Sequence, residues 1–158
     1  MEHSIINKLD VLAPNYSAKQ LNRSKRIIAK VNLLKRKLLQ GYELSIFQKR
    51  GNGINTLIQK TGRLNDLSGV FVISSSTGEP LILGSSKKVL AEIQKLTRGQ
   101  RVKDKEVLEK VANHYGFSNY KMSEKLLLAM TVNWLEVTDK TFRLMLKRAM
   151  MSNVKIVL

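Results

Sequence analysis

The sequence predicts an α+β fold in which a basic helical segment precedes a small three-stranded antiparallel sheet flanked by helices. Two patterns carry this prediction. Apolar residues recur at helical spacing from Ile27 to Leu39, and after Gly69 short β-branched runs alternate with turn residues. A chain of 158 residues has room for one well-cored domain and a modest extension. We therefore expect a basic helical region over residues 1–63 and an α+β domain over residues 64–158.

The first predicted helix begins at Ser17, a favourable N-cap, and ends near Gly41. Its apolar stripe comprises Ile27, Ile28, Val31, Leu34, Leu38 and Leu39. Four basic residues share another face of this helix, namely Arg23, Arg26, Lys30 and Lys37. Two shorter helices are expected over about Tyr42–Lys49 and Ile54–Lys60.

The three strands follow. Val70–Ser74 and Leu81–Leu83 are apolar runs separated by turn residues, which is typical of a β-hairpin. Thr131–Val137 is the third predicted strand. Four helices flank the sheet: one between an N-cap at Ser85 or Ser86 and a stop at Gly99, one over about Lys103–Tyr115, a short one at Ser123–Ala129, and a last one that begins at Thr138 or Asp139.

The charge of the chain is strongly positive and unevenly spread. It has 28 Lys and Arg against 12 Asp and Glu, a formal net charge of +16. The segment from Lys19 to Arg63 carries most of this excess and holds one acid, Glu43. Charge of one sign repels itself and is typical of proteins that a polyanion neutralises. We therefore predict a nucleic-acid-binding surface made of Lys19, Arg23, Lys25, Arg26, Lys30, Lys35, Arg36, Lys37, Lys49, Arg50, Lys60 and Arg63.

Composition excludes several other classes. The chain has no cysteine, so disulfides, thiolate metal sites and cysteine nucleophiles are excluded. No stretch approaches the roughly 18–20 apolar residues that span a bilayer, and the N-terminus does not resemble a signal peptide. We expect a soluble, intracellular, cytoplasmic protein that uses no metal or cofactor and has no membrane partner.

Two short motifs lie in the hairpin. They are Gly69-Val70-Phe71 and Ile82-Leu83-Gly84, followed by Ser85-Ser86-Lys87-Lys88. Together with the later helices, the strand Val132–Val137 and the helix after it, this order resembles the GIY-YIG endonuclease domain over about Leu67 to Leu158. The resemblance implies a fold built on a three-stranded sheet and a DNA-processing ancestry.

The catalytic residues that the resemblance implies are two tyrosines, an arginine and a metal-binding glutamate. In this sequence their positions fall on Phe71, Ile82, Glu92 and Lys147. None of the four can perform the family role, so the resemblance implies a catalytically inactive member. The reversed charges of Glu92 and Lys147 further predict an ion pair across the former active site.

Several functions remain open at this point. The leading hypothesis is a non-catalytic protein that binds double-stranded DNA, and structured RNA, including a ribosomal setting, is the alternative ligand. An active metal-dependent endonuclease would have to use other residues, of which the candidates are Tyr115, Tyr120, Glu124, Glu136 and Arg143. An inhibitor or adaptor that binds a protein partner is the third class. A membrane-surface helix is least favoured, because the predicted stripe lacks interfacial Trp or Phe.

Overall fold

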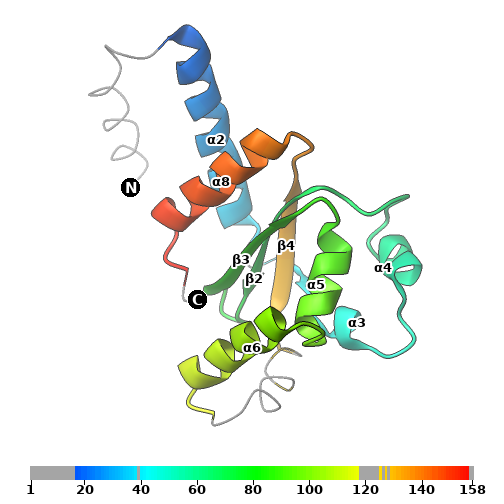
Figure 1. Cartoon of the computed structure of the whole chain (residues 1–158). Helices are drawn as coiled ribbons and strands as arrows, with labels where there is room; N and C mark the ends of the chain where they lie inside the picture. The colour runs from blue at the N-terminus through cyan, green and yellow to red at the C-terminus, as the bar shows by residue number, and fades with distance from the viewer. Residues whose placement is uncertain (1–16, 39, 118–124, 126, 128, 157–158) are drawn as a thin grey trace.

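A four-stranded antiparallel sheet lies at the centre of the structure, with helices on both of its faces (Figure 1). The computed structural model describes residues 17–38, 40–117, 125, 127 and 129–156. The strand order is β1-β4-β2-β3. The strands are β1 (Tyr42–Glu43), β2 (Gly69–Ser74), β3 (Pro80–Ser86) and β4 (Thr131–Glu136). The α+β class, the hairpin and the strand that begins at Thr131 are therefore confirmed.

The sheet has one strand more than the three expected. Residues 42 and 43, which the sequence predicts to be helical, form β1, and Tyr42 lies opposite Val132 on β4. The ring of Tyr42 also stacks on Trp134, with 4.8 Å between the ring centroids and an interplanar angle of 2°. Only one helical turn, α3 (Ser45–Gln48), remains of the helix predicted over Tyr42–Lys49. A two-residue strand is too short for its alternation to show in the sequence.

The two faces of the sheet are both covered by apolar side chains. Phe71 and Ile73 on β2 belong to a core shared with α3, α4 (Ile54–Lys60), α5 (Val89–Thr97) and α6 (Val102–His114). Val70 and Val72 belong to a second core on the other face, shared with α2 (Ala18–Arg36) and α8 (Lys140–Asn153). This alternation follows from the two-residue repeat of a strand. Leu34 and Phe47 enter these cores, so the segment before residue 64 packs into them with the rest of the chain.

The helices α4, α5 and α6 begin and end close to the predicted residues, but the N-terminus of α5 is capped differently. Ser85 and Ser86 lie in β3 and are not its N-cap. The carboxylate of Asp66 instead accepts hydrogen bonds from the backbone N–H groups of Leu90, at 2.9 Å, and Ala91, at 3.1 Å. The expectation of a serine cap was therefore wrong, because the capping residue comes from a loop 24 residues upstream.

The caps of α2 and α8 agree with the sequence. Ser17 and Gln20 form a capping box at the start of α2, and the Asp139 carboxylate accepts the Phe142 N–H at the start of α8. However, α2 ends at Arg36 rather than near Gly41, and the side-chain amide of the buried Asn133 donates to the Lys37 carbonyl just beyond its end. Leu39 and most of the helix predicted over 123–129 lie outside the described residues.

Candidate nucleic-acid interface

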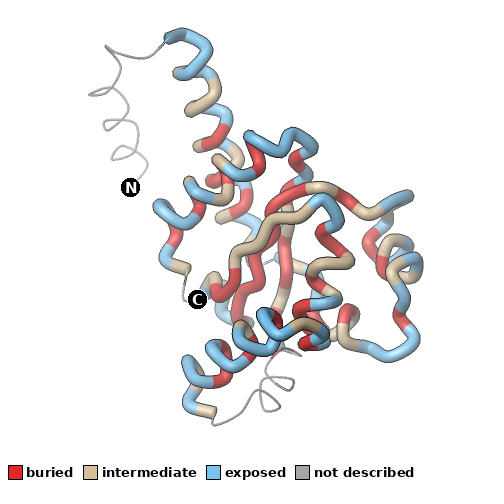
Figure 2. The backbone as a smooth tube through the Cα atoms, viewed as in Figure 1, coloured by how far each residue is buried: buried red, intermediate tan, exposed pale blue. Residues whose placement is uncertain are grey.

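The buried residues of helix α2 all lie in its second half. Ile27, Val31 and Leu34, spaced one turn apart, are its buried residues and pack in the core shared with α8. No residue of the preceding nine, 18–26, is buried. This projecting half of α2 extends past α8 and is exposed along most of its surface (Figures 1 and 2). At 1.5 Å per residue it is about 13 Å long.

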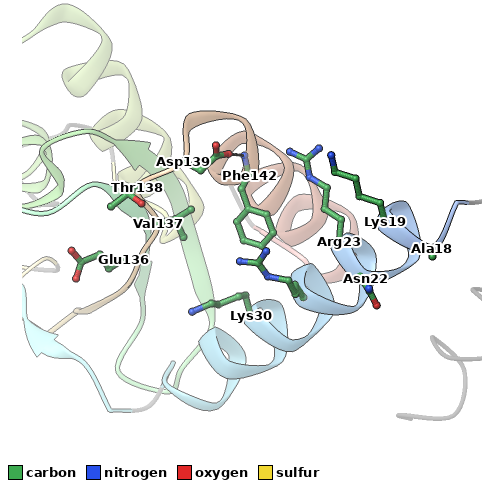
Figure 3. Close-up of a pocket in the computed structure, with 11 residues that line it drawn as sticks. Ala18, Lys19, Asn22, Arg23, Lys30, Glu136, Val137, Thr138, Asp139 and Phe142 are labelled. Atoms are coloured by element: carbon green, nitrogen blue, oxygen red, sulfur yellow. Dashed lines mark hydrogen bonds between the residues drawn. The ribbon is translucent and has the colours of Figure 1, made fainter.

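Four basic side chains form a stripe along α2, which we call the basic stripe. They are Lys19, Arg23, Arg26 and Lys30, at intervals of four, three and four residues. This spacing places them on one face of the helix, with neighbours about 5–6 Å apart. The stripe lines one wall of an open groove of about 860 Å³. The opposite wall is the segment Glu136–Asp139 with Phe142, at the start of α8 (Figure 3).

The two acidic residues that line this groove are both engaged elsewhere. Glu136 accepts a hydrogen bond from Arg63 at 2.6 Å in an ion pair, and Asp139 caps α8. The Arg26 guanidinium lies 5.2 Å from the centroid of the Phe142 ring, a cation–π arrangement. Within the described residues, no acid forms an ion pair with any member of the stripe. The groove is therefore lined by four cations that can neutralise phosphates and by the carboxylates of Glu136 and Asp139.

The other predicted basic residues do not join this groove. Lys25, Lys35, Arg36 and Lys37 belong to α2 and its C-cap but do not line the groove. Lys49, Arg50 and Lys60 follow α3 or end α4, on the opposite face of the sheet. Arg63 is the ion-pair partner of Glu136. The structure therefore does not bring the predicted basic residues together on one surface, because the order of charges along the chain carries no information on which face of the sheet each helix covers.

The positions implied to be catalytic lie in the core or apart from one another. Phe71 is 2% exposed and Ile82 is 8% exposed, and both pack in the core beneath α5. Glu92 lies on α5 and Lys147 on α8, which cover opposite faces of the sheet. The predicted Glu92–Lys147 ion pair is therefore wrong.

The Glu92 carboxylate is bound instead by Arg101, the N-cap residue of α6. Arg101 donates to both of its oxygens, at 2.7 and 3.0 Å, and also donates to the buried Asp104 at 2.7 Å. The hydrogen bond from Arg101 lowers the pKa of Glu92 below its ordinary value, and Lys103 adds to this effect. These contacts clamp the start of α6 to α5 and leave no free carboxylate for a metal there.

The residues that an active endonuclease would need do not come together either. Tyr115 follows α6 near the β2–β3 turn, and burial raises its pKa, with the Glu79 charge adding to the effect. Arg143 and Glu136 lie at the other end of β2, roughly 17 Å away along the strand. Tyr120 and Glu124 are outside the described residues.

Arg143 is a buried residue whose structural role is not apparent in the sequence. Its guanidinium donates to the Ser68 hydroxyl and to the Val137 carbonyl, at 3.3 Å for the second contact, and the residue is 5% exposed. It therefore joins α8 to the ends of β2 and β4. A basic residue at the fourth position of a helix is usually solvated, so no sequence signal marks this one as buried.

Neither a metal centre nor a membrane span is found in the described part of the chain. No group of three or more His, Cys, Asp or Glu side chains there could hold a metal ion. Among the helices of these same residues, none is both long enough and apolar enough to cross a membrane.

Comparison with known proteins adds no relative. No protein-family model, curated protein or solved structure matches the chain.

Proposed function

We propose that this protein binds double-stranded DNA through the basic stripe of α2 and does not cut it. The observation that carries the proposal is the projecting half of α2, which presents Lys19, Arg23 and Arg26 without any acid on the same helix. Backbone phosphates account for most of the affinity of such a surface, since each one that is neutralised releases condensed counterions.

The shape of α2 favours duplex DNA over duplex RNA. The major groove of B-DNA, about 12 Å wide and 8.5 Å deep, admits an α-helix, and a projecting half of about 13 Å is long enough to enter it. The major groove of A-form RNA is deep and too narrow for side chains to read. Asn22 and Arg23 on this half are residue types that hydrogen-bond to base edges, to adenine and guanine respectively.

The absence of cleavage in this proposal is supported by the residues at the implied catalytic positions. We regard the part from about Leu67 onward as a degenerate GIY-YIG-like domain, in which the order β2, β3, α5, α6, β4, α8 matches the order expected of that family. Phe71 and Ile82 have no group that exchanges a proton with water, and Glu92 is occupied by Arg101. A cysteine-free DNA-binding chain also suits a reducing, cytoplasmic setting.

Gel-shift binding tests the proposal. The ligands are a duplex DNA, the matching single strand and a structured RNA, each at two salt concentrations with magnesium present. We expect tight, salt-dependent binding to the duplex, with the DNA left intact. A variant with Lys19→Gln, Arg23→Gln, Arg26→Gln and Lys30→Gln should flatten the salt dependence by about 0.9 in slope for each phosphate that is no longer neutralised.

The matched control removes four exposed charges elsewhere, by Lys105→Gln, Lys110→Gln, Arg148→Gln and Lys155→Gln. Its net charge equals that of the α2 variant, so equal loss of affinity in both would contradict a specific role of the stripe. Tighter binding to the structured RNA than to the duplex DNA would show that RNA is the ligand. Cut DNA would overturn the non-catalytic assignment, and no binding at low salt would favour an acidic protein partner.

A further inference from the structure

A second basic surface lies away from α2. We call it the second basic patch, and it consists of Lys49, Arg50, Lys60 and Arg98. Lys49 and Lys60 line one open hollow and Arg50 and Arg98 line another, and Gln48 lines both hollows, so the four residues form a continuous surface. No acid is among the residues that line either hollow. Arg98 is the C-cap residue of α5 and was not among the predicted basic residues, because it lies outside the segment from Lys19 to Arg63.

The backbone beneath this patch is held in place by side-chain hydrogen bonds. The Arg98 guanidinium donates to the carbonyls of Phe47 at 3.2 Å, Lys49 at 3.1 Å and Asn52 at 3.0 Å. The side-chain amide of Gln94 donates to the Asn52 carbonyl at 2.7 Å, and that of Asn52 donates to Ile46 at 2.8 Å. The loop that carries Lys49 and Arg50 is therefore fixed before any ligand binds, which lowers the entropic cost of binding.

The sheet separates this patch from the basic stripe of α2. Phe47 and Leu57, which anchor α3 and α4, pack in the core on one face, whereas Ile27 and Leu34 of α2 pack in the core on the other. Figure 1 shows the projecting half of α2 and the pair α3 and α4 on opposite sides of the molecule. Two layer spacings of roughly 10 Å each lie between them.

A single duplex is poorly suited to touch both surfaces. DNA is stiff, with a persistence length of about 150 bp, and contact with both sides of one small domain would require a sharp wrap. The duplex that lies on α2 therefore leaves the second basic patch open. The Glu43 carboxylate, which accepts a hydrogen bond from Ser45 at 3.3 Å, lies beside this patch, but the patch itself carries four cations. An open and preorganised basic surface suits another polyanion of the same kind.

We propose that this protein bridges two DNA duplexes, one on the basic stripe of α2 and the other on the second basic patch. This inference rests on the proposed function of α2 and adds a second, independent contact. In this arrangement the folded domain acts as a spacer, and the sheet sets the distance between the two duplexes.

A two-duplex capture assay tests the inference. One duplex is fixed on beads, a second duplex carries a fluorophore, and captured fluorescence is measured as the full-length protein is added. The key variant is Lys49→Gln, Arg50→Gln and Lys60→Gln. Arg98 is kept because it holds the loop. The control variant is Lys105→Gln, Lys110→Gln and Lys155→Gln, which removes the same charge from other exposed sites.

We expect the wild type and the control variant to capture the second duplex. The patch variant should bind a single duplex on α2 but lose roughly tenfold or more of the captured fluorescence, because three cations that neutralise phosphates are removed. Undiminished capture by the patch variant would overturn the inference. A dimer that bridges two duplexes through its two copies of α2 would give this result, because it does not need the second basic patch. Equal loss of single-duplex affinity in the patch and α2 variants would also overturn it, because both sets would then form one footprint. Wild-type protein that binds no duplex at all would instead contradict the proposed function.

Discussion

Phe71 and Gly84 face each other across the β2–β3 hairpin, and the aromatic ring occupies the space that a side chain at position 84 would need. A Cβ atom built on Gly84 would overlap the ring of Phe71. The ring in turn is buried in the core beneath α5. Glycine at this position is thus explained by packing, without any catalytic role.

Substitution of Gly84 by alanine should therefore destabilise the protein. We expect Gly84→Ala to lower the free energy of unfolding by about 1–3 kcal/mol, because a buried ring has little room to move. Chemical denaturation measures this change. Gly53→Ala is the control, since a Cβ atom there meets no neighbour within 4 Å. Equal effects of the two substitutions would contradict the packing account.

The cap that Asp66 provides to α5 makes a second prediction. Asp66→Ala should lower the free energy of unfolding by about 1–2 kcal/mol, since two N–H groups at the start of α5 lose their acceptor. Ser86→Ala removes one of the two serines that the sequence suggested and the acceptor of the exposed Lys88 N–H, and it should cost less, about 0.5 kcal/mol. The reverse ranking in denaturant unfolding would show that Ser86 is the true cap.

The clamp between Arg101 and Glu92 predicts a dependence of stability on acid. Because the folded pKa of Glu92 lies below the ordinary value of 4.5, its ionised form stabilises the fold above that value. This contribution is lost as the pH falls through the lowered pKa. The midpoint temperatures of thermal unfolding of the wild type and of Glu92→Gln, measured from pH 7 down to pH 3, should therefore approach each other as the pH falls. A difference between them that is constant with pH would contradict the clamp.

The stacked pair of Tyr42 and Trp134 allows a spectroscopic test of β1. Trp134 is the single tryptophan of the chain, so its fluorescence reports on this pair alone. Tyr42→Ala should shift its emission to the red and lower the free energy of unfolding by about 0.5–1.5 kcal/mol. Tyr42→Phe keeps the ring and should leave both nearly unchanged. Emission that is identical in the wild type and Tyr42→Ala would contradict the stacking.

The features that the sequence predicted correctly are those set by neighbouring residues. Ser17 and Asp139 cap the helices that follow them, and the hairpin from Val70 onward depends on local alternation and turn residues. Contacts between distant segments were not predictable in this way. The Asp66 cap spans 24 residues, and Glu92 binds Arg101, the N-cap residue of α6, rather than a residue of α8. The regular spacing of charged or apolar residues indicates which face of a helix or strand they share. It does not indicate which other element packs against that face.

The candidate site, too, could be predicted from the sequence only in part. The basic stripe is set by helical spacing and could be predicted from Arg23, Arg26 and Lys30. The groove it lines could not, because the other wall comes from Glu136 and Asp139, more than 100 residues away along the chain. The separation of Lys49 and Lys60 from α2 likewise depends on which face of the sheet each helix covers.

The projecting half of α2 has a thermodynamic consequence for any ligand that it meets. Lys19 and Arg23 are four residues apart, as are Arg26 and Lys30, and like charges at this spacing weaken an isolated helix. The buried contacts that would compensate begin only at Ile27. Backbone amides of residues 18–26 should therefore exchange with solvent faster than those of residues 27–34. A polyanion that neutralises these charges would order the helix as it binds, so part of the binding enthalpy would come from helix formation and the rest from the contact itself.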